Sequence, residues 1–393
     1  MSNRILLPTP SGGLETYTLR GVAAPRPAGG AAFNRIAYSA AHVVSDPLAA
    51  VDPWVDCAID WDATIDYRRH LWSLGLGVAE AMDTAQRGMG LDWTTSLELI
   101  RRSLDAARDV PGASVASGCG TDHLAPEAAR TLEDVIAAYE QQVEAIEALG
   151  GRLILMASRA LVRVARGPED YARVYGRILE QVREPVILHW LGDMFDPQLR
   201  GYWGDEDISR AMDTALGVIA DHAAKVDGIK VSLLDKDREL EMRRRLPEGV
   251  RMYTGDDFNY AELIAGDGVG ELPTHRHSDA LLGIFDAIAP AASAALAAGD
   301  AARFHEILAP TVPLSRHIFA APTRFYKTGV VCVAWLNGHQ DHFSMVGGQQ
   351  SARSLQHIAE LFRLADQAGV LERPDLAVQR MAQWLAVHGI HQS

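Results

Sequence analysis

Residues 227–232, DGIKVS, and residues 250–255, VRMYTG, decide the fold of this chain. Each is a short apolar run with the length of a buried strand. The charged segment between them, at 236–245, has the spacing of an amphipathic helix. A strand, a helix and a second strand in this order are typical of a parallel sheet that is covered by helices.

The same unit repeats along the chain and predicts eight strands. They lie at 35–44, 77–82, 113–118, 152–158, 185–190, 227–232, 250–255 and 268–273, with helices between them. Eight such units close a (β/α)8 TIM barrel, an α/β fold. A doubly wound open sheet is the alternative. However, the glycine cluster at 266–270 does not follow a strand, as a dinucleotide-binding turn would.

We divide the chain into three segments. Residues 1–34 contain a hairpin at 4–20 and a linker rich in Pro, Gly and Ala, and residues 35–278 form the barrel. Residues 279–393 form a C-terminal helical extension, with helical sequence expected at 279–308, 311–320, 350–368 and 374–388.

Composition narrows the class of protein. The chain has 393 residues, 48% of them hydrophobic, and a formal charge of −14, which argues against nucleic acid or an anionic membrane as a partner. Three cysteines (Cys57, Cys119 and Cys332) cannot form a disulfide framework, and the start of the chain does not resemble a signal peptide. No apolar run reaches the length of about 18 residues that a membrane helix needs. We therefore expect a cytoplasmic protein that acts on a small molecule.

Barrel enzymes carry their active sites at the carboxyl ends of the strands. The predicted strand ends are rich in polar and aromatic side chains, so we interpret this rim as the candidate site. Its members are Asp83, Thr84 and Gln86 after the second strand, Ser158 after the fourth, His189, Trp190 and Asp193 at the fifth, Lys230 and Ser232 at the sixth, Asp256 after the seventh, and His275 and His277 after the eighth.

Lys230 stands out because lysine is rare here. Only four of the 37 basic residues are lysines, and Lys230 lies inside an apolar strand. Burial lowers the pKa of a lysine, and the neutral amine can attack a carbonyl to form a Schiff base. The alternative is a lysine that only pairs with a rim carboxylate such as Asp256.

The stretch DGIKVSLLD, followed by a helix and by VRMYTGDD, resembles the dihydrodipicolinate synthase / N-acetylneuraminate lyase family. There, Gly-Ile-Lys on the sixth strand carries the Schiff-base lysine, and Ser/Thr-Gly-Asp-Asp ends the seventh. Weaker similarity covers MDTAQRG (82–88), ASGCG (116–120) and ILHW (187–190), within residues 35 to 370. The resemblance implies a class I aldolase-like lyase with Lys230 as the imine-forming residue, no separate cofactor, and a homo-oligomer.

The chain departs from the family pattern at several positions. The family's catalytic tyrosine after the fourth strand has no counterpart in MASRA (156–160), so His189 or Ser158 would have to relay protons. Of the family's paired threonines only Thr84 remains, and Asp83 before it disfavours a substrate carboxylate nearby. Trp190, Trp203 and the aspartates Asp193 and Asp196 would suit a sugar-like ligand, although the tryptophans could equally serve packing.

We therefore expect a lyase that acts on a 2-keto acid or an oxidised sugar derivative. Lys230 would form the imine and Asp256 would orient it, His189 would be the acid–base group, and Asp83, Thr84 and Gln86 would bind hydroxyls. The alternative is a metal-dependent or general acid–base sugar isomerase, epimerase or hydrolase without an imine, its metal held by rim histidines such as His123, His189, His275 and His277. A third reading is a sugar-binding protein on a retired lyase fold.

Overall fold

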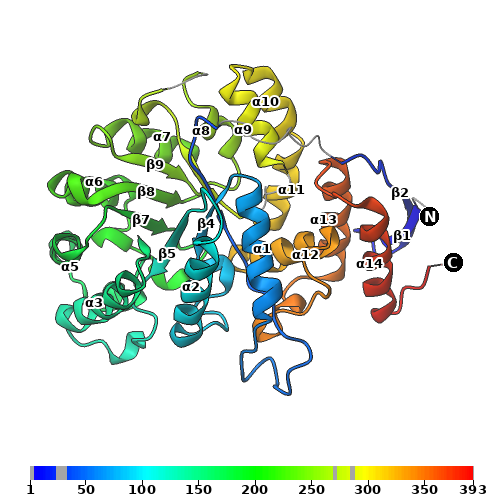
Figure 1. Ribbon diagram of the computed structural model, residues 1–393, viewed down its shortest axis with the longest axis horizontal. Coiled ribbons are helices and arrows are strands. Elements are labelled where there is room, and N and C mark those ends of the chain that lie inside the picture. The colour runs from blue at the N-terminus through cyan, green and yellow to red at the C-terminus, as the bar shows by residue number, and fades with distance from the viewer. Residues whose placement is uncertain (1–3, 24–32, 269–271, 284–287, 393) are drawn as a thin grey trace.

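A computed structural model describes residues 4–23, 33–268, 272–283 and 288–392. Eight parallel strands close into a barrel in the order β10-β3-β4-β5-β6-β7-β8-β9, which confirms the predicted (β/α)8 fold (Figure 1). The strands are β3 (Ala37–Ala40), β4 (Gly77–Glu80), β5 (Val115–Cys119), β6 (Arg152–Leu155), β7 (Val186–Leu191), β8 (Val226–Ser232), β9 (Arg251–Thr254) and β10 (Asp279–Leu282).

Helices surround the barrel and begin at recognisable caps. They are α1 (Trp61–Ser73), α2 (Trp93–Ala107), α3 (Leu132–Ala148), α4 (Arg159–Val164), α5 (Pro168–Gln181), α6 (Ile208–Asp221), α7 (Lys236–Arg245), α8 (Tyr260–Ala265) and α9 (Ala289–Ala297). The side chains of Asp60, Asp92 and Asp235 accept backbone N–H groups at the starts of α1, α2 and α7. Thr131 and Asp134 form a capping box at the start of α3.

The extension packs against one side of the barrel and carries the hairpin (Figure 1). It consists of α10 (Ala301–Leu308), α11 (Thr311–Ile318), α12 (Tyr326–Asn337), α13 (Leu355–Gln367) and α14 (Pro374–Val387). The predicted hairpin is present as β1 (Arg4–Pro8) and β2 (Leu14–Thr18). Its Tyr17 hydroxyl donates to Asp366 at 2.7 Å, and Arg363 donates to the Pro8 carbonyl at 2.8 Å. The hairpin therefore covers the extension rather than the barrel.

The prediction of the eighth strand at 268–273 was wrong. Residues 269–271 lie outside the described residues, and the strand that closes the barrel is β10, where Ala280 pairs with Ala37 of β3 and Thr254 of β9. The predicted barrel boundary at residue 278 thus falls just before this strand. Helical sequence was expected from residue 279, but the strand β10 lies at that position. Helix α12 was not expected.

Two tyrosine side chains lie in the barrel interior. Tyr38 and Tyr253 meet edge to face with ring centroids 6.2 Å apart. Glycines opposite make room for them, because a Cβ on Gly77 would lie 2.6 Å from the Tyr38 ring and one on Gly228 would lie 2.7 Å from the Tyr253 ring. These two rings therefore occupy part of the barrel interior.

The buried Glu239 of α7 makes the stability of the fold depend on pH. Its buried carboxylate accepts the Thr254 hydroxyl at 2.9 Å and the Ser278 hydroxyl at 2.7 Å. Burial, above all other causes, raises the pKa of Glu239 from 4.5 to about 8. Between these two pH values the folded chain holds a proton that the unfolded chain has lost, so stability falls as pH rises through this window.

We expect Glu239→Gln to remove this component of the pH dependence, because the amide stays neutral throughout. Urea unfolding of the wild type and the variant at pH 5 and pH 8 measures it. The wild type should lose more stability between the two pH values than the variant does. Glu184→Gln, at an exposed position, is the matched control and should behave as the wild type does. Equal losses in wild type and Glu239→Gln would contradict the assignment.

Candidate active site

Lys230 points into the barrel from near the carboxyl end of β8. On this strand Ile229 and Val231 pack outward against the helices, so the alternating residues Gly228, Lys230 and Ser232 face the interior. The register places Lys230 directly beside His189 of β7. The side chain is buried, with 9% of the residue exposed. The predicted position of Lys230 is thus the observed one.

Gly255, just after β9, allows the close packing around this lysine. A Cβ at position 255 would lie 2.2 Å from the Ser232 hydroxyl oxygen and 2.7 Å from Cε of Lys230. Any larger residue would displace both side chains. The glycine of the Thr-Gly-Asp-Asp motif therefore has a steric role at the amine.

Burial governs the charge of Lys230. Removal from water lowers the pKa of its amine, and the carboxylates of Asp83 and Asp257 partly oppose this effect. No ion pair involves Lys230 within the part of the chain that the structure describes. The amine thus stands near two carboxylates without an ion pair to either, and its burial shifts the equilibrium toward the neutral, nucleophilic form.

The two aspartates after β9 have different roles. Asp256, expected to orient Lys230, instead shapes its own loop: it accepts the N–H groups of Phe258 at 2.8 Å and Asn259 at 3.1 Å. Asp257 is the aspartate that acts on Lys230. Burial raises the pKa of Asp257 well above its usual value, and the charge of Lys230 counters this. The prediction that Asp256 orients Lys230 was therefore wrong. Asp256 bonds to its own loop, and the next residue, Asp257, acts on the lysine.

His189 lies inside the same site and is fully buried. Its Nε2 is 3.5 Å from the Ser232 hydroxyl and its Nδ1 is 4.0 Å from Asp83. Burial, and then the positive charge of Lys230, lower the pKa of His189 well below its usual value. The imidazole is therefore neutral near pH 7 and can accept a proton, but it does not hold one ready for donation.

The extension contributes two residues that the sequence did not reveal as site members. The Tyr326 hydroxyl, in the first turn of α12, lies 2.9 Å from the Thr84 hydroxyl. Burial raises the pKa of Tyr326 well above its usual value, and Asp83 and Asp257 add to the shift. These are the same two carboxylates that act on Lys230. Tyr326, Thr84 and Lys230 therefore share one electrostatic environment.

Lys327 follows Tyr326 and is also buried. Burial lowers the pKa of Lys327 to about 8, against the attraction of Asp83 and Asp196. Arg159 and Lys230 contribute to the lowering because their positive charges oppose that of Lys327. A lysine with a pKa of about 8 still carries its charge at pH 7. The site thus holds a second amine, mainly cationic, beside the first.

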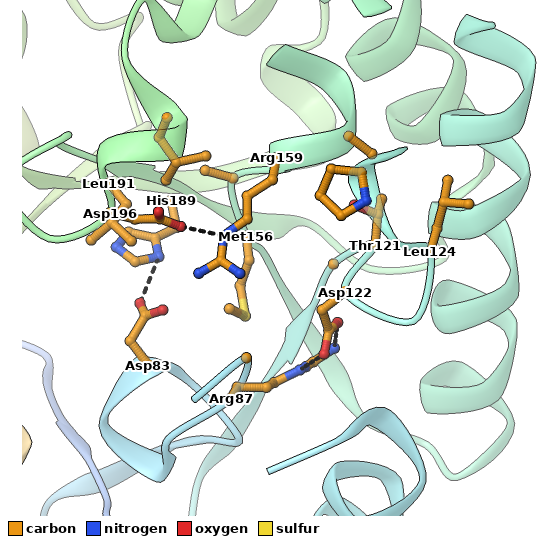
Figure 2. A pocket seen from close by; sticks show the side chains of 16 residues that line it. Asp83, Arg87, Thr121, Asp122, Leu124, Met156, Arg159, His189, Leu191 and Asp196 are labelled. Carbon is orange, nitrogen blue, oxygen red and sulfur yellow. Dashed lines mark hydrogen bonds and ion pairs between the residues drawn. The ribbon is translucent and has the colours of Figure 1, made fainter. Parts of the chain in front are cut away.

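A pocket of about 100 Å³ opens next to these groups (Figure 2). Asp83 and His189 line one side, and Arg87 and Asp122 form an ion pair of 2.5 Å on the other. Arg159 at the start of α4 extends between them and pairs with Asp196 at 2.5 Å. Its side chain is 36% exposed, so its guanidinium can also meet a ligand.

Several predicted binding residues lie away from this pocket. Trp190 is on the outer side of β7 and packs against Trp203, with ring centroids 6.4 Å apart. Gln86 donates to the Val346 carbonyl at 2.7 Å and fixes the extension. Ser158 caps α4, and its hydroxyl contacts Thr121 at 2.6 Å. These three side chains therefore serve packing and loop geometry.

Asp193, His275 and His277 are also outside the pocket. Asp193 is exposed in a neighbouring depression that Asp205 and Arg200 also line. The two histidines precede β10 instead of following a strand, so they lie at the amino ends of the strands, opposite the pocket. Their placement at the rim was wrong because the eighth strand had been predicted too early.

The rim histidines do not assemble a metal site in the described ranges. His123 pairs with the Gln142 amide at 2.8 Å, and His277 lies 3.7 Å from Asp279. The one group of possible ligands found there is His70, His339 and Glu372, outside the barrel mouth.

Comparison with solved structures identifies the class of fold. Dihydrodipicolinate synthase from Aquifex aeolicus matches with a TM-score of 0.62 and 13% identity, over 86% of this chain and 99% of that one. The Acinetobacter baumannii enzyme complexed with pyruvate matches with a TM-score of 0.61 and 16% identity, over 86% and 100%. The putative enzyme from Pseudomonas aeruginosa matches with a TM-score of 0.61 and 16% identity, over 85% and 99%. The chain has the barrel fold of these lyases.

The family model described as "Protein of unknown function (DUF993)" matches residues 5–390, so the chain belongs to this family. Among curated protein sequences no significant match is found. In the described residues no helix is both long and apolar enough to cross a membrane.

Proposed function

We propose that this protein is a Schiff-base-forming lyase of the class I aldolase type, which acts on a 2-keto acid or an oxidised sugar derivative that carries a carboxylate. The observation that carries the proposal is the buried, unpaired amine of Lys230 at the carboxyl ends of the strands, packed against Gly255. The pyruvate complex of a structure with the same fold supports a keto acid as the substrate class.

The cationic groups indicate where the carboxylate of the substrate binds. Arg159 lines the pocket, and Lys327 is close enough for the two charges to act on each other. A guanidinium and an ammonium together suit a carboxylate. Asp83 occupies the loop after β4 and disfavours a carboxylate there, but it can accept a substrate hydroxyl. The substrate would thus lie with its carboxylate toward Arg159 and Lys327.

Tyr326 and Thr84 provide a path for protons. As Lys230 Nζ attacks the carbonyl carbon, the carbonyl oxygen takes up a proton and later leaves as water, while the nitrogen loses its protons. Tyr326 can deliver and recover a proton through the Thr84 hydroxyl at 2.9 Å. The neutral imidazole of His189 can accept the proton of a substrate hydroxyl when the carbon–carbon bond breaks. The imine accepts the electron pair of the broken carbon–carbon bond until a proton adds to the carbon that lost its partner.

Borohydride trapping tests this proposal. The protein is incubated with pyruvate, a panel of other 2-keto acids and oxidised sugars, and is then reduced. We expect one candidate to give a stable mass gain equal to that compound less one oxygen atom, on the peptide that carries Lys230. Because the chain has only four lysines, the modified lysine can be assigned from the mass of its peptide. An adduct on Lys327 alone, or no adduct with any candidate on folded protein, would contradict the proposal.

A further inference from the structure

We propose that His70, His339 and Glu372 form a divalent transition-metal site that fastens the C-terminal extension to the barrel. His70 is in the last turn of α1, His339 follows α12, and Glu372 precedes α14. One ligand atom from each lies within 4.8 Å of the other two. Two imidazoles and a carboxylate are a ligand set that zinc and other first-row divalent ions accept, with water completing the coordination.

The distances fit ligands around one ion. His339 Nε2 is 3.0 Å from Glu372 Oε1, and the rings of His70 and His339 have centroids 4.2 Å apart. The side chains of His339 and Glu372 are 14% and 9% exposed, so solvent competes little for the carboxylate.

The backbone that carries two of the ligands is held rigidly. The Asn337 amide donates to the Val370 carbonyl at 2.9 Å, and its oxygen accepts the Glu372 N–H at 3.0 Å. Gly338 ends α12 in the left-handed conformation, at φ 89°, and so turns the chain toward His339. Hydrogen bonds of Asn337 therefore join the two segments of the extension without any contribution from His70 of the barrel.

The position of the site gives it a consequence for the barrel mouth. Helix α12 begins at Tyr326, whose hydroxyl lies 2.9 Å from that of Thr84, and ends at Asn337, two residues before His339. A clamp at this end would restrain the whole helix relative to α1, and with it the hydroxyl at the other end. The inference concerns the joint between barrel and extension, and it stands whether or not Lys230 forms an imine.

Zinc binding by the full chain tests the inference. After treatment with a chelator and dialysis, we expect isothermal titration with zinc chloride to show one ion per chain. Zinc at 100 times its dissociation constant should raise Tm by at least about 2 °C. His70→Gln and Glu372→Gln should each weaken binding more than about tenfold. His305→Gln, an exposed histidine on α10, is the matched control and should bind as the wild type does.

Cobalt substitution separates a metal site from a fold defect. The wild type with Co²⁺ should show visible absorption bands of a nitrogen- and oxygen-ligated ion, and Glu372→Gln, if folded by circular dichroism, should lose or shift them. No bound ion in the wild type, or binding that both ligand variants retain, would overturn the inference.

Discussion

Lys230→Met is expected to lower kcat/KM by at least about 10⁴-fold and to abolish the borohydride adduct. Methionine keeps the length and burial of the side chain but cannot form a carbon–nitrogen double bond. Loss of a covalent nucleophile removes most of the catalytic acceleration of an enzyme, because the remaining groups act through it. The measurement is the steady-state rate with the keto compound that the trapping experiment identifies.

Lys236→Met is the matched control for this result. Lys236 is a partly exposed residue that pairs with Glu262 at 2.7 Å and does not line the pocket. Its loss should leave the rate and the adduct unchanged. A rate for Lys230→Met within about tenfold of the wild type would show that the amine is not the nucleophile.

Tyr326→Phe should lower kcat by about 10²- to 10⁴-fold, the range of a lost acid–base group. The change removes one oxygen and leaves the ring in place. Because the amine remains, prolonged incubation with substrate and borohydride should still label Lys230. Slow turnover with a trapped imine distinguishes a proton relay from a merely structural tyrosine.

Tyr175→Phe controls for the loss of a buried hydroxyl. Tyr175 is on α5, and its hydroxyl lies 2.8 Å from that of Tyr202, which is between β7 and α6; neither residue lines the pocket. Each variant leaves a buried partner without its hydrogen bond, at a cost of about 1–3 kcal/mol in stability. If the two variants lost the same stability and the same activity, Tyr326 would have no special part in the reaction.

The barrel could be predicted because its signal is repeated. Seven of the eight predicted strands overlap observed ones, and the alternating strands and helices leave few other folds. The eighth strand failed since Asp279–Leu282 has only four residues and was assigned to the start of the helical extension. Because of that error, His275 and His277 were predicted at the wrong end of the barrel.

The candidate site could be predicted only where one strand determines it. Lys230 was found because its strand alternates regularly and the lysine interrupts an apolar run. Tyr326 and Lys327 meet it through tertiary packing of a helix that was not expected, whose valines Val330, Val331 and Val333 disfavour a helix. A signal was nevertheless present: a rare lysine beside a tyrosine opens a stretch so apolar that every residue of α12 is buried.

The order of synthesis follows from the location of Tyr326. The strands of the barrel precede α12 in the chain, so Lys230 is synthesised before Tyr326. A nascent chain that ends before residue 326 would hold the amine without the tyrosine hydroxyl and without the neighbouring cation of Lys327. On our proposal, such a chain would carry a nucleophile that has no means to complete a reaction. The C-terminal extension would thus complete the active site that the barrel begins.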